Sequence, residues 1–436
     1  MKLEGACCIM KNIGEKKLWT SDFTCITLAT VLSAIGGEAM NLPVSLSVFE
    51  ETKSTFLSSL IMICGMLPDI ILPVFVAPLI DTNSKKKWAI YLEILMAFTY
   101  GVMGLLVLGY GFRYEWYLIF TFIVATISVL YRLTYSAWYP DLIPVGLEQK
   151  GYAISGMIYP IIIIMMSPIA TFLYERVVMS SLFFFVFLLC LGSVFLKSRI
   201  QEDFCKKREI TSFKKYRDEI KEGFSYLKKE KGIRNIYLYM SVTSGASDGI
   251  NIVTQAYYQT QTWLSVTMLG FLKSAEMLGR VCSGYFQYKM EIPPKKRYRF
   301  IKFVYTFYDT MDAFLLWMPY PLMLLNRFFC GALGTSSATI RETAVQSYLP
   351  SDMRARVNAI FNIIFAVGGI FFQFLAGGLG QMLSYQTVSL LLGSIAFVAM
   401  IMLIVIPKKE NQPIYEAERK STEVLENDYK SIEIIE

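Results

Sequence analysis

Residues 144–154 read PVGLEQKGYAI, and residues 350–360 read PSDMRARVNAI. The positions that match, each pair 206 residues apart, are Pro144 and Pro350, Lys150 and Arg356, Ala153 and Ala359, and Ile154 and Ile360. Each copy lies between two long apolar runs, and those runs also pair across the halves of the chain. Similarity at one fixed spacing indicates an internal duplication. The sequence therefore predicts two related halves.

The composition indicates that most of this chain lies in a lipid bilayer. Hydrophobic residues make up 54% of the 436 and charged residues only 18%, a balance too apolar for ordinary soluble cores. Backbone polar groups in lipid must pair within their own segment, so each span is expected to be a helix.

Twelve stretches of mainly apolar residues are long enough to cross the bilayer as helices. They are residues 21–47, 56–80, 88–110, 116–138, 152–174, 177–196, 235–258, 263–287, 300–318, 320–345, 356–378 and 384–406. The predicted fold is all-α, with two six-helix bundles related by a pseudo-twofold axis along the membrane normal, because both copies of the repeat follow the fourth span of their half.

The segments outside the spans have different predicted roles. Residues 1–20 and 407–436 are expected to be tails, the second one disordered. Residues 197–234 connect the two bundles, 21–196 and 235–406, and apolar residues recur there every three or four positions. That spacing predicts an amphipathic helix on the membrane surface.

The distribution of basic residues predicts the orientation. With both ends on one side, that side holds 33 Lys and Arg, whereas the opposite loops hold three, Lys53, Arg113 and Arg176. The positive-inside rule then places both termini in the cytoplasm. No apolar core precedes the first span, so no cleavable signal peptide is predicted, and a plasma-membrane location is expected.

Several functions are disfavoured by what the sequence lacks. It contains no histidine, which excludes Ser-His-Asp catalysis and imidazole metal sites. The eight cysteines are scattered, and no phosphate-cradling loop is found. We therefore expect that the protein is not an enzyme and has no metal, cofactor or nucleic-acid partner. Separately, we expect a monomer whose partners are the bilayer, a small-molecule substrate and protons.

A loop after the second span carries a recognisable signature. Ala77 is followed by Asp81, Ser84 and the basic run 85–87, which resembles the cytoplasmic motif of the major facilitator superfamily. The resemblance implies that Asp81 and Lys85 form a conformational latch. Ala77 and Ser84 replace the family's glycines, and the second half keeps only an outline of the motif, with no matching Asp.

Other stretches resemble the twelve-span drug and siderophore exporter branch of that superfamily. They are residues 33–37 with Leu42-Pro43, Leu67-Pro68, 222–227 and 348–359. The resemblance covers nearly all of 21–406. It implies the major facilitator fold and export by alternating access, and it leaves the substrate open.

Charged residues inside the spans are the candidate functional residues, since a charge at the bilayer centre costs about 2.5–3.5 kcal/mol. Glu38 and Asp69 are candidates for proton coupling or substrate contact. For Glu38 the alternative is a polar residue at the outer rim, and for Asp69 it is pairing with a cation. Arg132 could lower the pKa of a neighbouring acid, or its side chain could extend to the headgroups.

The second half has further candidates. Asp248 lies in a stretch rich in Ser, Thr, Gly and Asn, which favours a wet cavity wall. Lys273, Glu276 and Arg280 follow an i, i+3, i+7 pattern and are expected to neutralise one another, with Asp309 and Asp312 as further partners. Arg327 could bind an anionic group or pair with one of those carboxylates.

The leading hypothesis is a proton-coupled exporter of small amphipathic molecules. An importer, a uniporter or a lysolipid flippase would use the same architecture. A membrane enzyme or a receptor is the reading from another class, and no motif supports it.

Overall fold

The computed structural model describes residues 18–80, 84–144, 147–201, 224–289, 292–350 and 353–417. The long helices of the first half are Ser21–Thr52 (α1), Thr55–Ile80 (α2), Lys85–Tyr110 (α3), Tyr114–Trp138 (α4), Glu148–Arg176 (α5) and Met179–Ser198 (α6). Side-chain caps fix some of the starts: Thr20 accepts a hydrogen bond from Phe23 N, and Ser84 accepts one from Lys87 N.

The second half repeats this arrangement. Its long helices are Lys231–Thr260 (α8), Val266–Lys289 (α9), Pro294–Phe314 (α10), Tyr320–Tyr348 (α11), Arg354–Met382 (α12) and Tyr385–Met400 (α13), the last continued by a π-helical turn, Ile401–Val405. Pro144 precedes α5 and Pro350 precedes α12, the fifth long helix of each half. The duplicated stretch therefore occupies equivalent places in the two bundles, as the sequence predicts.

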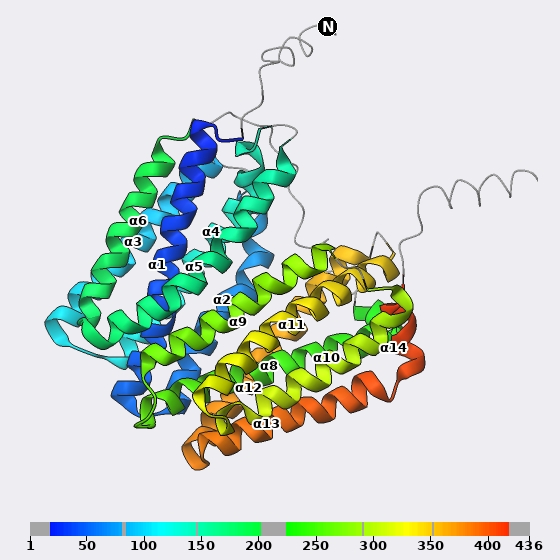
Figure 1. The fold of residues 1–436 in the computed structure, drawn as a ribbon. Helices are drawn as coiled ribbons and strands as arrows, with labels where there is room; N and C mark the ends of the chain where they lie inside the picture. The colour runs from blue at the N-terminus through cyan, green and yellow to red at the C-terminus, as the bar shows by residue number, and fades with distance from the viewer. Residues whose placement is uncertain are drawn as a thin grey trace, which may run out of the picture.

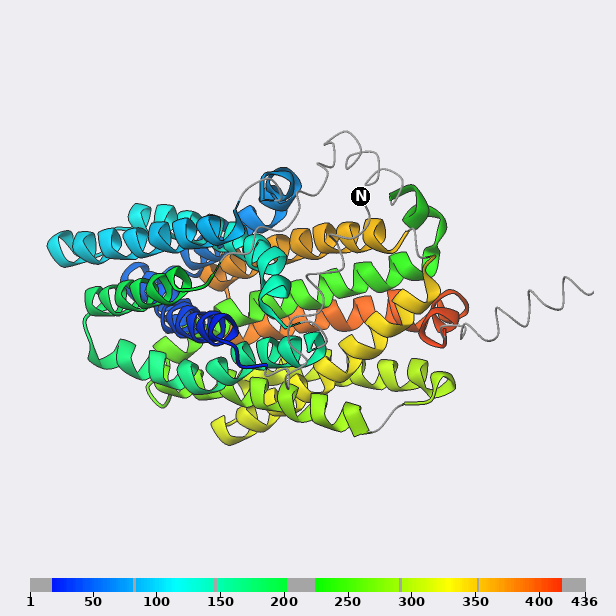
Figure 2. The ribbon, with the colours of Figure 1, turned by 90° about the horizontal axis from the view of Figure 1, so that it is seen from above.

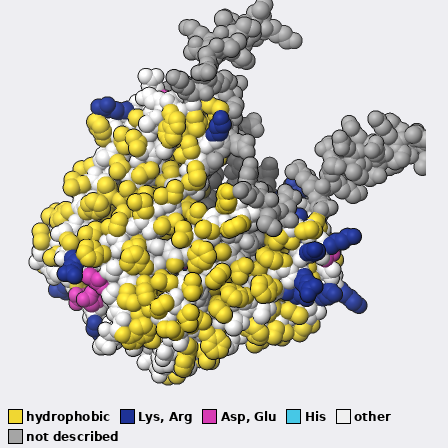
Figure 3. All heavy atoms as spheres, viewed as in Figure 1, with side chains coloured by type: hydrophobic (Ala, Val, Ile, Leu, Met, Phe, Trp, Pro, Cys, Tyr) yellow, Lys and Arg dark blue, Asp and Glu magenta, His cyan; other side chains and the backbone are white. Residues whose placement is uncertain are grey.

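The helices suit a membrane, and no strand occurs among the described residues. Seven helices in the described part are long and apolar enough to cross a bilayer: α1, α3, α4, α5, α6, α12 and α13. Helices α8 to α11 carry more polar and charged residues. Figure 3 shows a face covered mainly by hydrophobic side chains, with Lys and Arg gathered near its margins.

Each half has its own core. In the first half Tyr100, Tyr117, Phe120 and Phe183 pack edge to face. In the second half tyrosines of α8 and α10 form a comparable cluster. A further cluster joins the halves, because Leu42 and Leu46 of α1 pack with apolar residues of α8 and α12.

The two bundles meet at one end and diverge toward the other (Figure 1). We call the end where α1 begins and α13 ends the termini face, and the end where α1 ends and α13 begins the distal face. Figure 2 gives the view from above, in which helices of the first half overlap helices of the second half in projection. All hydrogen bonds seen between described residues of the two halves lie at the middle of the helices or nearer the distal face.

Close helix contacts seal the distal face. Thr55 Oγ1 donates to Gly377 O at 2.9 Å, joining α2 to α12. A Cβ on Gly377 would collide with Ser59, so glycine is required for this approach. On the other side Glu175, at the end of α5, accepts from Val266 N at 2.7 Å and Thr267 N at 3.2 Å. It thereby caps α9 of the other half.

Some segments differ from the sequence predictions. The expected disordered tail 407–436 begins with a short helix, Lys408–Tyr415 (α14), because Asn411 bonds the carbonyls of Leu403 and Ile404 and Tyr415 is buried. The segment is short and charged, so its sequence gave no sign that it packs against the bundle. Lys197, assigned to the connector, lies inside α6. The predicted amphipathic helix falls mostly on residues 202–223, outside the described residues.

Candidate functional site

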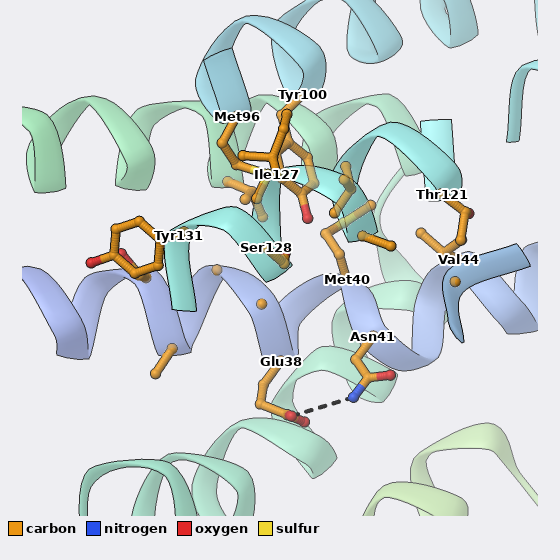
Figure 4. Close-up of a pocket in the computed structure, with 18 of the residues that line it drawn as sticks. Glu38, Met40, Asn41, Val44, Met96, Tyr100, Thr121, Ile127, Ser128 and Tyr131 are labelled. Atoms are coloured by element: carbon orange, nitrogen blue, oxygen red, sulfur yellow. Dashed lines mark hydrogen bonds between the residues drawn. The ribbon is translucent and has the colours of Figure 1, made fainter. Parts of the chain in front are cut away.

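The first half contains a cavity of about 790 Å³, within the range of small-molecule sites. Residues of α1 to α6 line it, together with Gln373 of α12. Figure 4 shows Glu38, Met40, Asn41 and Val44 on α1, with side chains of α3 and α4 around the same space. The wall is mainly apolar, with a few polar groups that could orient a ligand.

Glu38 connects this cavity to the other half. Lys273 Nζ of α9 donates to Glu38 Oε2 at 2.9 Å, and Asn41 Nδ2 donates to Glu38 Oε1 at 3.3 Å. The Glu38 side chain is 12% exposed. This contact corrects the expected triplet of Lys273, Glu276 and Arg280. Lys273 is near the distal end of α9, where the bundles touch, whereas Glu276 pairs with Arg280 at 2.6 Å.

Asp69 and Arg132 form an ion pair between α2 and α4. The sequence singled out both residues without placing them together. Arg132 lines the cavity, and the side chains are 45% and 63% exposed, respectively. Because the pair is accessible, solvent screens it and its contribution to stability is small.

A buried ion pair was not found by sequence reasoning. Lys197 Nζ of α6 donates to Glu93 Oε2 of α3 at 2.7 Å, and Ser33 Oγ donates to Glu93 Oε1 at 2.9 Å. The Lys197 amine also lies 4.3 Å from the centre of the Tyr131 ring. Glu93 lines the cavity. A carboxylate within the third predicted span was the available signal.

Asp248 of α8 lies beside the cavity wall. Its carboxylate lies beside the side chain of Gln373, which lines the cavity and is 5% exposed. Among the described residues no cation pairs with Asp248. Gln373 gave no signal in the sequence, since a neutral amide is not unusual in a span.

The interior of the second half holds further carboxylates. Arg327 pairs with Asp312 at 2.8 Å, both side chains being 4% exposed, so of the two expectations for Arg327 the structure places it with a carboxylate. Asp309 accepts from Tyr239 at 3.0 Å and from Thr243 at 2.6 Å. No group of metal-ligating residues that could hold an ion occurs in the described part of the chain.

The predicted latch is only partly visible. Asp81 lies outside the described residues. Lys85 Nζ donates to Asp141 Oδ2 at 2.6 Å and to Ala137 O at 2.8 Å. Lys85 therefore joins the start of α3 to the end of α4 within the first half.

Two six-helix bundles, a cavity among the helices of the first bundle, and helices long and apolar enough to cross a bilayer are the features of a membrane transporter. The family model described as Major Facilitator Superfamily matches residues 26–308 and 311–433. The chain belongs to this superfamily. No curated protein matches it significantly.

Solved structures share the fold. The nucleoside transporter NupG is 12% identical with a TM-score of 0.65, covering 88% of this chain and 99% of that one. A D-xylose-proton symporter is 12% identical with a TM-score of 0.64, covering 91% and 99%. A bacterial homologue of the iron transporter ferroportin, in an inward-facing state, is 14% identical with a TM-score of 0.62, covering 89% and 98%. These identities support the fold alone.

Proposed function

We propose that this protein is a proton-coupled exporter of small amphipathic molecules that works by alternating access. It acts as a monomer in the plasma membrane with both termini in the cytoplasm, an orientation supported by the excess of basic residues on the side of the termini. The cavity then faces the cytoplasm in the conformation described above, because the distal face is sealed.

The observation that carries the proton coupling is the environment of Asp248. Of the three carboxylates proposed to couple protons, Glu38 is paired with Lys273 and Asp69 with Arg132. A carboxylate paired with a cation holds its charge, whereas one without a cation in a poorly hydrated site can exchange a proton more readily. Asp248 contacts the cavity through Gln373, so its protonation can act on a bound substrate.

The shape and lining of the cavity support the substrate class. A volume of about 790 Å³ accommodates a drug-sized molecule, and the apolar wall favours a ligand with a large hydrophobic surface. The three charged lining residues, Glu38, Glu93 and Arg132, each already have a partner of opposite charge. The free polar groups are mainly hydroxyls and an amide.

Transport requires the distal seal to open while the termini face closes. The contacts that must then break include the Glu38–Lys273 pair, the cap that Glu175 provides to α9, and the bond from Thr55 to Gly377. Each joins one half to the other, so a rocking motion of intact bundles can break them without unfolding a helix.

A transport assay in proteoliposomes tests the proposal. A proton gradient should drive a panel of amphipathic fluorescent dyes against their own gradient, and Asp248→Asn should abolish that drive while part of the binding remains. Glu115→Gln, on the exposed start of α4, is the matched control. If no dye moves under either polarity of the gradient, antiport is wrong.

The direction is tested separately in cells. Expression should lower the cellular content of a labelled substrate. A higher content would indicate import, and movement without dependence on the gradient would indicate a uniporter or a lysolipid flippase.

A further inference from the structure

Gln373 occupies a special place between the two halves. Gln373 belongs to the second half, whereas the other described residues that line the cavity belong to the first half. It also contacts Asp248, the carboxylate without a cation. Gln373 is therefore the direct contact between the proposed proton carrier and the space for the substrate.

The amide of Gln373 is held at one end and unpartnered at the other. Its Nε2 donates to Met66 Sδ of α2 at 3.0 Å and is the group that can donate to the carboxylate of Asp248. Its Oε1 is buried and has no hydrogen-bond partner among the described residues. A buried acceptor without a partner is unfavourable, and here it lies in a side chain that lines a cavity.

The backbone of α12 brings these groups together. Gly369 lies one turn before Gln373, and a Cβ at Gly369 would be 2.8 Å from Met66 Cε and 3.3 Å from Asp248 Oδ2. The missing side chain thus lets α2 and α8 approach the same face of α12. This supports a built contact among Asp248, Gln373 and Met66.

We propose that Gln373 Oε1 is an acceptor for which the substrate and the proton on Asp248 compete. The substrate would be an amphipathic molecule that carries an N–H or O–H donor. The inference rests on the proposed function, because it takes Asp248 as the proton carrier and adds how proton binding releases the substrate.

The competition follows from the hydrogen-bonding capacity of the groups. An ionised carboxylate only accepts, so it takes the amide N–H of Gln373 and leaves Oε1 for a donor on the ligand. A protonated Asp248 gains an O–H that requires an acceptor in this buried place. The acid and the amide then form two hydrogen bonds, O–H to Oε1 and N–H to the acid carbonyl, and the ligand loses its acceptor.

Several charged groups on the helices around α8 have partners of their own. These groups and their partners are Asp312 with Arg327, Asp309 with Tyr239 and Thr243, Lys273 with Glu38, Glu276 with Arg280, and Asp69 with Arg132. Asp312 is the carboxylate that acts on Asp248 through its charge. Gln373 is not a partner of any of these groups, so its acceptor atom Oε1 stays available.

Two probes that share the triphenylacetyl group and differ in two N-methyl groups test whether the ligand must donate. Triphenylacetamide offers amide N–H donors, N,N-dimethyltriphenylacetamide offers none, and neither titrates between about pH 4 and about pH 9. Binding of the tritiated probes to the full-length protein in nanodiscs is measured across this range. At high pH triphenylacetamide should bind roughly 3- to 10-fold more tightly, the value of one neutral hydrogen bond, and the preference should vanish at low pH.

Two substitutions of Asp248 should have opposite effects. Asp248→Asn keeps a donor toward Gln373 Oε1, so triphenylacetamide should bind weakly at every pH. Asp248→Leu has no donor, so binding should be tight at every pH. Gln373→Met should remove both the preference and its pH dependence, while Gln259→Met, a glutamine near the end of α8 away from the cavity, should match the wild type. If Asp248 had only a structural role, both Asp248→Asn and Asp248→Leu would change the affinity for triphenylacetamide in the same direction.

Infrared difference spectroscopy tests the contact without any ligand. Acidification should produce a carboxylic acid C=O band that Asp248→Asn removes. Gln373→Met should move that band to higher wavenumber, because the acid loses its hydrogen-bond partners. An Asp248 band that is unchanged in Gln373→Met overturns the inference, as does equal binding of the two probes at high pH.

The failure of this inference can be distinguished from failure of the proposed function. Binding and spectra are recorded without a proton gradient. If a proton gradient drives dye transport but the Asp248 band is unchanged in Gln373→Met, the proposed export function stands and proton coupling does not involve Gln373. If substrate and proton compete for Gln373 Oε1 but a proton gradient drives no transport, the proposed export function is contradicted and the inference about Gln373 stands.

Discussion

The two halves share a frame and differ in how they hold charge. In the first half the buried carboxylate Glu93 has a cation, Lys197, and the exposed Asp69 has Arg132. In the second half Arg327 pairs with Asp312, while Asp248 and Asp309 have no cation among the described residues. The charged residues of the cavity wall in the first half are therefore paired with opposite charges, whereas the second half holds carboxylates without a cation among the described residues.

This difference indicates a division of labour after duplication. The repeated residues lie at the starts of α5 and α12, where they build equivalent helix entries. The charged residues that form the ion pairs are not repeated at this spacing. A rocking mechanism needs the frame in both halves, whereas a substrate needs only one binding place.

The largest expected effect is on the buried pair of the first half. Lys197→Met leaves Glu93 buried without its cation and should lower the free energy of unfolding by about 3–5 kcal/mol. Thermal unfolding of the purified protein measures it. Lys87→Met, on an exposed side chain at the start of α3, should change little.

A second variant separates pairing from packing. In Glu93→Leu with Lys197→Met both charges are removed, and most of the lost stability should return because apolar residues can replace a buried pair. If the single Lys197→Met variant is as stable as the wild type, Glu93 does not depend on Lys197, and the contrast between the halves fails.

The next effect concerns the place where the halves meet. Gly377→Val puts a side chain against Ser59 and Thr55, and overpacking of this kind costs about 1–3 kcal/mol. The cost falls on the sealed distal face, so the conformation open at that face should gain population. Distances between spin labels at Lys53 and Met382 measure the change.

The neighbouring glycine provides the control. A Cβ on Gly378 meets no atom within 4 Å, so Gly378→Val should give the wild-type distance distribution. Equal distributions for both valine variants would show that the contact of α2 with α12 does not set the seal.

Glu175 should have a smaller effect on the same equilibrium. Glu175→Gln keeps the shape but removes the charge that caps α9, a contribution of about 1 kcal/mol. The labelled pair should then show a shift of roughly fivefold toward the conformation open at the distal face. Glu115→Gln is the control, and a shift in the opposite direction would mean that Glu175 does not hold the halves together.

The sequence predicted the frame better than the contacts. The apolar runs and the repeat were sufficient for the two bundles, since hydropathy and backbone pairing decide where helices lie. The contacts depend on which helix faces are adjacent, as with Lys273, which pairs with Glu38 of the other half, 235 residues away. Gln373 carries no charge, so its role became visible only beside Asp248 and the cavity.

The smallest expected effect separates exposed from buried pairing within the first half. Arg132→Gln breaks the pair with Asp69, and both side chains are accessible enough for water and salt to screen the charges. The free energy of unfolding should therefore fall by less than about 1 kcal/mol, measured by thermal unfolding at low and high salt. A loss as large as that of Lys197→Met, unchanged by salt, would mean that this pair is shielded, and exposure would then no longer distinguish the two pairs.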